Sequence, residues 1–369
     1  MPKKLTFPII FIILILLNIT ARLFTPFADF HRNFVFPVIM NIFSRTSGII
    51  PFSVGEILIL TAIISGIFAI ISFTYFMTSK KYKPDRKKIA NRYSKTLAII
   101  LVFILGTGTF NYFLLHHCST FGTVYGIPNR EHTADELFKT AVMVAGKANE
   151  ASNNITRNEQ DRFVITTDLY PETKAAMQKL GETYPAFKGY YPNPKPMLFA
   201  KTATRLRLLG IYFPFTMEAN YNPMISDMYV PFTICHEFAH LKGWMPEDEA
   251  NFIAYLACIY SDNPDLIYSG YTNALGYLWT KVKDECPPGK YNQFLDSIDN
   301  KVWDDIYQSH DIFREASAET VGSIKVGEIM NNVSETVIDA NLIIQGVPDG
   351  SKSYGRFVDL ILNYYDIME

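Results

Sequence analysis

Three long apolar runs in the first third of the chain constrain its fold more than any other feature. They cover residues 7–23, 54–78 and 96–115, and isoleucine, leucine and phenylalanine dominate them. About 20 such residues are enough for a helix to cross the hydrocarbon core of a bilayer. A cleaved signal peptide is an alternative for the first run, but no small-residue cleavage site follows it. The sequence therefore predicts a membrane domain with three transmembrane helices in residues 1–117.

The basic residues between these runs predict an orientation in the bilayer. Residues 79–95 carry eight lysines and arginines, whereas residues 24–53 carry only Arg32 and Arg45. Cytoplasmic loops of membrane proteins are the ones rich in lysine and arginine. We therefore expect the N-terminus in the cytoplasm and residues 118–369 outside it.

The net charge of −2 conceals two differently charged parts. Residues 1–117 hold 13 basic and 3 acidic side chains, a net charge of +10, and residues 118–369 hold 21 and 33, a net charge of −12. An acidic domain does not attract phosphate groups, which argues against nucleic acid as a partner. Its length suits one sizeable core. Helical periodicity predicts a mainly α domain, with helices near 132–151, 168–183, 264–284, 290–308, 317–344 and 354–367.

Residues 236–240 read His-Glu-Phe-Ala-His, which is an HExxH motif. Two histidines four residues apart lie on one face of a helix, so both imidazoles can bind one Zn²⁺. The glutamate between them, Glu237, is then placed to act as a general base. Pro231 suits the start of such a helix, and Gly243 suits a left-handed residue just after its end. The motif predicts a zinc metallopeptidase that acts on peptide or protein substrates.

A catalytic zinc site needs a third protein ligand. Pro246 stands where the metzincin pattern has its last histidine, which disfavours that class. In glutamate-type zincins a glutamate on a following helix completes the site, and residues 246–258 are expected to form such a helix. Glu249 shares a stripe with apolar residues of this helix and is the preferred ligand, because it should point inward. Glu247 and Glu218 are the alternatives.

Residues 208–216 are aromatic and β-prone, and Pro214 confines them to an edge strand or an irregular run. Zincins commonly lay the substrate along an edge strand, where a peptide can add as a further strand. An ordinary buried hairpin fits the same residues equally well. The candidate substrate-binding residues of this region are Tyr212, Phe213, Phe215 and Asn220.

A peptidase also needs a donor for the oxyanion of its tetrahedral intermediate. Near the C-terminus, Tyr354 offers a phenol and Arg356 a guanidinium, and either could serve. A surface turn leading into the last helix is the alternative interpretation of these residues.

The chain resembles an uncharacterised family of bacterial three-pass membrane proteins, known only as a domain of unknown function with a zincin-like motif. The resemblance covers nearly the whole chain and implies a metallopeptidase-like domain. It gives added weight to Glu218, Glu249, Tyr354 and Arg356, and it supplies no substrate. Besides the three spans, it rests on Phe213–Thr216, Glu218–Asn220, His236–His240, Glu247–Cys258 and Tyr354–Arg356.

These observations lead to one main hypothesis. We expect a membrane-anchored, zincin-like and mostly helical extracytoplasmic domain with a small sheet or edge strand, in which His236, His240 and Glu249 bind Zn²⁺. The alternative is a non-catalytic zinc-binding membrane sensor or envelope assembly factor. A structural zinc site usually has four protein ligands, often cysteines, and the chain has no CxxC pair. A transporter is a third hypothesis, but the spans carry only Arg22 and Glu56, each near a boundary, and no charge pair inside them.

Overall fold

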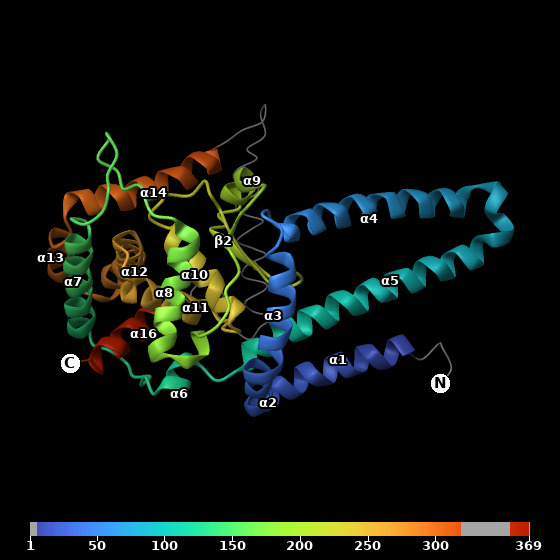
Figure 1. The fold of residues 1–369 in the computed structure, drawn as a ribbon, viewed down its shortest axis with the longest axis horizontal. Coiled ribbons are helices and arrows are strands. Elements are labelled where there is room, and N and C mark those ends of the chain that lie inside the picture. The colour runs from blue at the N-terminus through green and yellow to red at the C-terminus, as the bar shows by residue number, and fades with distance from the viewer. Residues whose placement is uncertain (1–5, 319–354, 369) are drawn as a thin grey trace. The chain divides into compact units, whose positions relative to one another are not determined.

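Helices make up most of the chain, and one small three-stranded sheet accompanies them (Figure 1). The computed structural model describes residues 6–318 and 355–368. Two compact units can be distinguished. The first comprises the residues up to Cys118 together with Phe213–Glu218, and the second comprises Ser119–Tyr212 and the residues from Ala219 onward.

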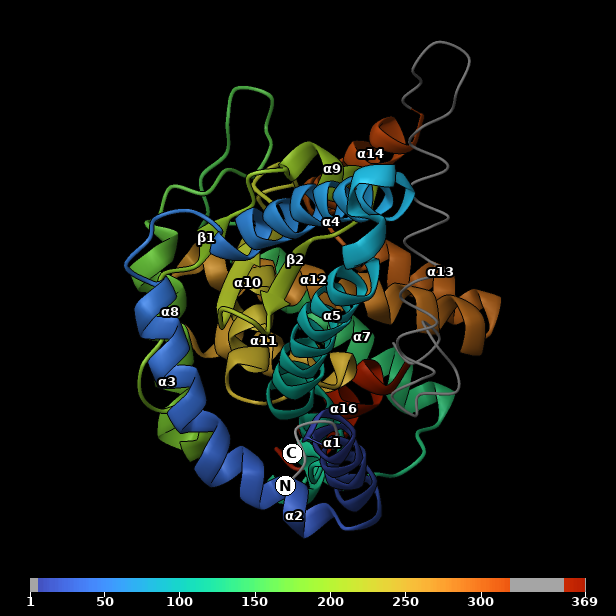
Figure 2. The same ribbon diagram turned by 90° about the vertical axis from the view of Figure 1, so that its right-hand side faces the viewer.

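The first unit contains three helical segments that are long and apolar enough to cross a membrane, which confirms the three predicted runs. They are Thr6–Leu23, Val54–Thr78 and Lys80–His117. Helix α1 (Thr6–Leu23) forms the first and α4 (Val54–Thr78) the second. Helix α5 (Arg86–Gly108) forms most of the third, and it runs back beside α4 after the basic turn Lys80–Asp85 (Figures 1 and 2).

The surface of these helices suits a lipid environment. No residue in the apolar window of α4 is buried inside the protein, and Phe68 is 71% exposed. Exposing such a surface to water would be unfavourable, whereas hydrocarbon accepts it, and a helix satisfies its own backbone hydrogen bonds there. The three helices therefore suggest membrane association.

The residues between the first two spans are mostly helical. They form α2 (Thr25–Phe30), a short π-helix (His31–Val35) and α3 (Phe36–Ser47). Pro26 and Pro37 each lie at the start of a helix, where the missing N–H of proline costs nothing.

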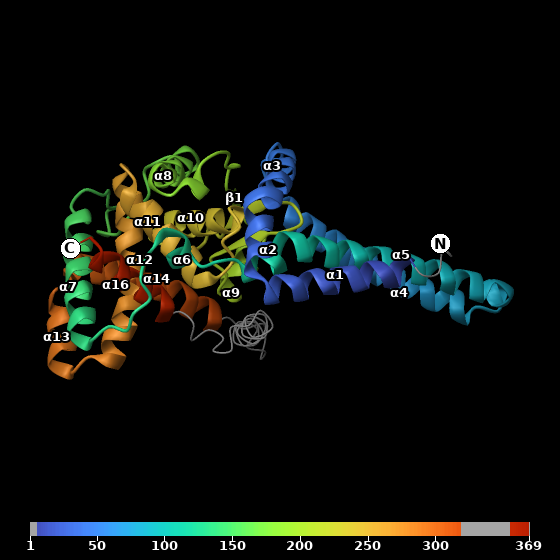
Figure 3. The same cartoon turned by 90° about the horizontal axis from the view of Figure 1, so that it is seen from below.

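The second unit is built around two nearly fully buried helices, α10 (Val230–Leu241) and α11 (Glu247–Tyr260). Helices α8 (Leu169–Thr183) and α12 (Pro264–Glu285) pack against this pair, and α10, α11 and α12 lie next to one another in Figure 3. The other helices are α6 (Phe121–Tyr125), α7 (Ala134–Ala151), α9 (Ala200–Arg205), α13 (Pro288–Asp296), α14 (Asn300–Ala318) and α16 (Gly355–Asp366).

The predicted helices near 132–151, 168–183, 264–284 and 354–367 are confirmed as α7, α8, α12 and α16. The predicted helix 317–344 lies almost wholly outside the described residues.

The prediction of a single helix over residues 290–308 is wrong, because two helices, α13 and α14, cover this stretch with a break between them. Asn149 stabilises the break: its Nδ2 donates to the carbonyl of Ser297 (2.8 Å) and its Oδ1 accepts from the N–H of Asp299 (3.0 Å). A side chain from α7 thus satisfies backbone groups that a continuous helix would have paired internally.

The sheet has the strand order β1-β3-β2, which places β2 (Gly210–Phe213) at an edge. Strand β1 (Lys195–Pro196) runs parallel to β3 (Glu218–Tyr221), with Lys195 opposite Asn220. Pro214 lies in the turn after β2 and not within a strand. Strand β2 is therefore both the first strand of a hairpin and an edge strand, so the two interpretations of the sequence are compatible.

Candidate metal centre

Helix α10 carries the HExxH motif and ends in a Schellman turn. Gly243 has a φ of +85°, a left-handed conformation that glycine adopts without strain. Its N–H donates to the carbonyl of His240 (2.9 Å), and the N–H of Trp244 donates to the carbonyl of Ala239 (3.1 Å). This turn brings the carbonyl group of Trp244 back to the ring of His240.

Hydrogen bonds fix the orientation of both histidine rings. Nδ1 of His240 lies 2.8 Å from the carbonyl oxygen of Trp244, which can only accept, so this nitrogen carries the hydrogen. Nδ1 of His236 lies 2.8 Å from Oδ1 of Asn251 on α11 and donates to it in the same way. In each neutral ring the lone pair is therefore on Nε2. Metal-binding histidines typically have this arrangement, because a hydrogen bond at one nitrogen aims the other at the ion.

The two Nε2 atoms and the carboxylate of Glu247 converge. The Nε2 atoms of His236 and His240 are 3.0 Å apart, and they lie 3.1 Å and 3.7 Å from the nearest Glu247 oxygens. These three residues form a group that could hold a metal ion. Bonds of about 2.0 Å in a tetrahedral zinc site place neighbouring ligand atoms about 3.3 Å apart. The donor set therefore fits zinc in both chemistry and spacing.

The pKa values of the two histidines reflect their burial and their closeness to each other and to Glu247. Burial disfavours a charged His236, but the hydrogen bond and the charge of Glu247 outweigh it and raise the pKa of His236 to about 9. Burial lowers the pKa of His240 to about 4, and the positive charge of His236 adds to that effect. A cation is thus favoured at the centre of the group, and without a metal a proton on His236 supplies the charge.

Glu237 lies on the same helix in a buried position beside the metal group. Its side chain is 4% exposed, and burial raises its pKa to about 8, opposed by the backbone N–H of Tyr212 and by the charge of His236. Among the described residues, Oε2 of Glu237 has no hydrogen-bond partner. A buried carboxylate oxygen without a partner is costly, and such groups are typical of functional sites.

Gly210, at the start of β2, allows this strand to approach Glu237. A Cβ atom at this position would overlap Oε1 of Glu237 and would lie 2.7 Å from Cγ2 of Thr233. No other residue type fits here without displacing its neighbours. The edge strand and the candidate base are therefore in direct contact.

The structure does not bring the preferred ligand Glu249 into the metal group and brings Glu247 there instead. Glu249 is indeed buried, but its Oε1 accepts a hydrogen bond from the N–H of Phe121 (2.8 Å), at the start of α6. Glu218 accepts hydrogen bonds from the N–H groups of Val54 (3.1 Å) and Gly55 (2.8 Å), at the start of α4. Both glutamates thus satisfy donors at the first turn of a helix.

Two of the four predicted substrate-binding residues lie in the second unit. The ring of Tyr212 is 6.1 Å from that of His240, and Nδ2 of Asn220 donates to the carbonyl of Ile211 (3.3 Å). Phe213 and Phe215 belong to the first unit, and their rings are 5.6 Å apart.

Of the two predicted oxyanion donors, Arg356 belongs to the described part of the chain. Tyr354 lies outside the described residues. Nε of Arg356 donates to Oδ2 of Asp248 (3.0 Å), the residue next to Glu247, and the Arg356 side chain is 45% exposed. The guanidinium therefore lies beside the helix turn that provides the third candidate ligand.

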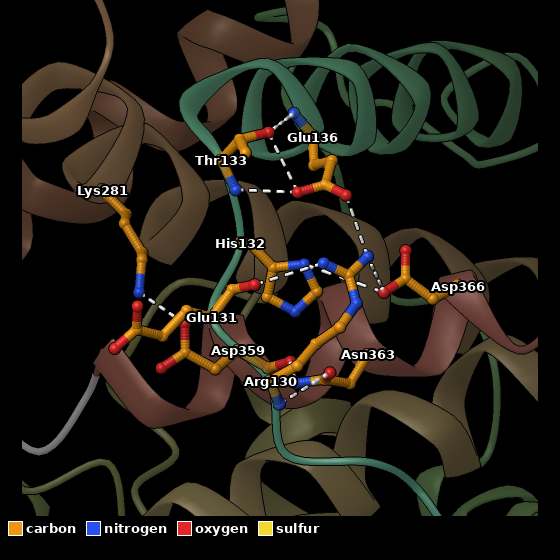
Figure 4. A network of polar contacts seen from close by, with 9 residues as sticks. All are labelled: Arg130, Glu131, His132, Thr133, Glu136, Lys281, Asp359, Asn363 and Asp366. Carbon is orange, nitrogen blue, oxygen red and sulfur yellow. Dashed lines mark hydrogen bonds and ion pairs between the residues drawn. The ribbon is translucent and has the colours of Figure 1, made fainter.

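A second group, His132, Glu136 and Asp366, also has the side-chain types for a metal. The guanidinium of Arg130 lies between the carboxylates of Glu136 and Asp366 (Figure 4). Its Nη2 is 2.9 Å from Glu136 and 2.5 Å from Asp366. Arginine already supplies the positive charge that an ion would bring. The Arg130 contacts with Glu136 and Asp366 hold α16 beside the start of α7.

Three contributors to the site were missed in the sequence, namely Asn251, Trp244 and Gly210. One signal for Asn251 was present, because it follows Glu247 by four residues and therefore shares its face of α11. The carbonyl of Trp244 and the close approach at Gly210 are backbone features. Patterns of residue types do not predict such backbone features.

Comparison with known proteins identifies a family but no function. A family model described as "Protein of unknown function (DUF3810)" matches residues 31–362. Neither a curated protein nor a solved structure matches the chain.

Proposed function

We propose that this chain, which belongs to the DUF3810 family of proteins of unknown function, is a membrane-bound zinc metallopeptidase. His236, His240 and Glu247 would hold the zinc ion, and Glu237 would be the general base. The observation that carries this proposal is the convergence of two Nε2 lone pairs and one carboxylate, 3.0 to 3.7 Å apart, beside a buried carboxylate.

The number of ligands favours catalysis over a structural role. A structural zinc is normally enclosed by four protein ligands, whereas a catalytic zinc keeps one position open. Among the residues that the structure describes, the metal group has three members. Glu247 is 37% exposed and His236 is 13% exposed, so the group can be reached from solvent. A buried glutamate between the two histidines would also have no purpose in a purely structural site.

The chemistry would be the hydrolysis of a peptide bond. When bound, zinc polarises a carbonyl group and lowers the pKa of a water molecule. Glu237 would accept a proton from the attacking water and donate it to the leaving nitrogen, a role for which a raised pKa is suited. Asn251 and the carbonyl of Trp244 would keep both histidines oriented. The guanidinium of Arg356 would be released from Asp248 to stabilise the developing negative charge, or Tyr354 would serve instead.

The peptidase would work outside the cytoplasm. Residues 79–95, between the second and third spans, carry eight basic side chains and would remain inside. Three spans then leave the residues after Cys118 on the opposite side. Its substrates would be peptides or proteins of the cell envelope.

The test is a paired measurement of zinc content and peptide cleavage on the full chain in detergent micelles. Wild type should bind about one zinc and cleave members of a fluorogenic peptide library. Glu237→Gln should retain the zinc and lose activity by at least about a hundredfold, because the base is removed while the ligands remain.

Three results would count against the proposal or a part of it. His236→Ala/His240→Ala should bind no zinc, and a wild type that binds none when zinc is supplied would overturn the metal site. Full zinc binding without cleavage of any peptide would instead favour a zinc-binding sensor or assembly factor. Unchanged activity in Glu237→Gln would remove the base assignment.

A further inference from the structure

A hollow of about 450 Å³ lies among α12, α13 and α14, away from the residues of the metal centre. This volume is within the range of small-molecule sites. Its lining contains four aromatic side chains and one carboxylate, together with Leu295 and Asn300. The aromatic residues are Trp279, Tyr291, Trp303 and Tyr307, and the carboxylate is Asp304.

Three of these rings lie close together, and two of the three ring pairs meet at steep angles. The Trp279 ring is nearly perpendicular to that of Trp303 (79°, centroids 5.2 Å apart) and steep to that of Tyr307 (73°, 6.4 Å). Trp303 and Tyr307, one turn apart on α14, are tilted by 31° with centroids 5.5 Å apart. A cation is attracted to an aromatic face within about 6 Å of the centroid. Rings this close together allow one cation to contact more than one of them.

The indole N–H groups of both tryptophans are already used inside the protein. Nε1 of Trp279 donates to the hydroxyl of Tyr291 (3.0 Å), and Nε1 of Trp303 donates to the carbonyl of Leu295 (3.3 Å). These bonds fix the orientation of both rings, and both rings line the hollow.

The charge of the hollow favours a cation. Among the described residues, Asp304 has no hydrogen-bond or ion-pair partner, and it lies one residue after Trp303. Aromatic faces bind cations through their negative quadrupole, and a neighbouring carboxylate adds to that attraction. We propose that this hollow, the aromatic site, binds an organic ammonium ion, with a quaternary ammonium group such as that of choline as the best fit.

The experiment is a titration of the full chain, kept in maltoside micelles that contain no choline group. Trp279 and Trp303 are two of the three tryptophans in the chain, so tryptophan fluorescence reports on the site. Choline should give a saturable change, and 3,3-dimethyl-1-butanol, its neutral isostere, should not. Glycerophosphocholine is titrated in parallel, and binding of it as tight as that of choline would identify a lipid headgroup as the source.

Variants test the named residues. Asp304→Asn and Trp303→Leu should each weaken choline binding by about tenfold or more, because each removes one of the attractions to the cation. Asp296→Asn removes an exposed acid on α13 outside the lining and should bind choline as wild type does. Circular dichroism and zinc content show whether each variant is folded.

Several results would overturn the proposal. The first is the absence of a saturable change with choline up to about 0.1 M, because any binding above that concentration would be too weak to be specific. The second is equal binding of choline and its neutral isostere. The third is wild-type affinity for choline in Asp304→Asn. Saturable binding of an N-acetylglucosamine oligomer without binding of choline would also overturn it, in favour of a sugar site.

Discussion

Oδ1 of Asn251 on α11 lies 2.8 Å from Nδ1 of His236 on α10, and this hydrogen bond links the two helices of the metal centre. Asn251 follows Glu247 by one helical turn, so α11 provides both a candidate ligand and the residue that orients another. The geometry of the site therefore depends on how these two helices pack.

Replacing Asn251 should weaken zinc binding without abolishing it. Asn251→Ala leaves Nδ1 of His236 without its acceptor, and loss of such a partner typically reduces metal affinity by about 10- to 100-fold. Asn251→Asp retains an acceptor at the same place and should bind zinc at least as tightly as Asn251→Ala. Competition with a chromogenic chelator measures the affinities. Equal affinity in wild type and Asn251→Ala would show that the hydrogen bond has no part in orienting the ligand.

Glu247 and Glu249 should respond differently to the same substitution. Glu247→Gln removes a candidate ligand and should lower zinc content sharply while the fold persists. Glu249→Gln should retain zinc but lose about 1–3 kcal/mol of stability, because the buried N–H of Phe121 loses its charged acceptor. Zinc content and thermal unfolding of both variants decide the matter. The opposite pattern would restore Glu249 as the ligand.

Gly210→Ala should impair catalysis more than metal binding. The added Cβ overlaps Oε1 of Glu237, so the candidate base must move, while the three ligand residues remain in place. Gly276→Ala on α12 is the matched control, since a Cβ there meets nothing within 4 Å. We expect near-normal zinc content with loss of peptide cleavage in the first variant and neither effect in the second. Normal cleavage by Gly210→Ala would contradict the close contact.

The Arg130–Glu136–Asp366 group should make the anchoring of α16 sensitive to acid. The hydrogen bond from Arg130, and those from Thr133, lower the pKa of Glu136 to about 2. A lowered carboxyl pKa means that the stabilisation is complete above the unfolded-state value of 4.5 and is lost as the pH falls from there toward 2.

Glu136→Gln provides the matched comparison for this effect. The glutamine side chain can still accept the hydrogen bond from the backbone N–H of Thr133 that completes the capping box, but it carries no charge. The difference in melting temperature between wild type and this variant should be greatest above pH 4.5 and should shrink toward pH 2. A difference that does not change with pH would assign the effect to capping alone.

The sequence predicted the elements of the site better than their partners. The three spans, the HExxH helix and its glycine end follow from local patterns, and the structure contains all of them. The candidate group contains Glu247 and not the preferred Glu249, for an instructive reason. Its place on an apolar stripe correctly indicated burial, but burial does not say which donor a carboxylate meets inside. That donor was the backbone of Phe121, which lies 128 residues away in the chain.

Other differences have the same origin. The break between α13 and α14 depends on the side chain of Asn149, and the environment of Glu237 depends on the backbone of Tyr212. Both are contacts between distant segments, and hydrophobic periodicity carries no information about them.

The candidate ligands His236, His240 and Glu247 all fall within one stretch of twelve residues, 236–247. Closing so short a loop costs little chain entropy, so this stretch can capture an ion early in folding, before distant segments have come together. The candidate base is different, because its surroundings include Gly210 and Tyr212, which must arrive from an earlier part of the chain. Retention of the two histidines and Glu247 in a DUF3810 relative would therefore indicate at most a capacity to hold an ion, and it would not by itself identify an enzyme.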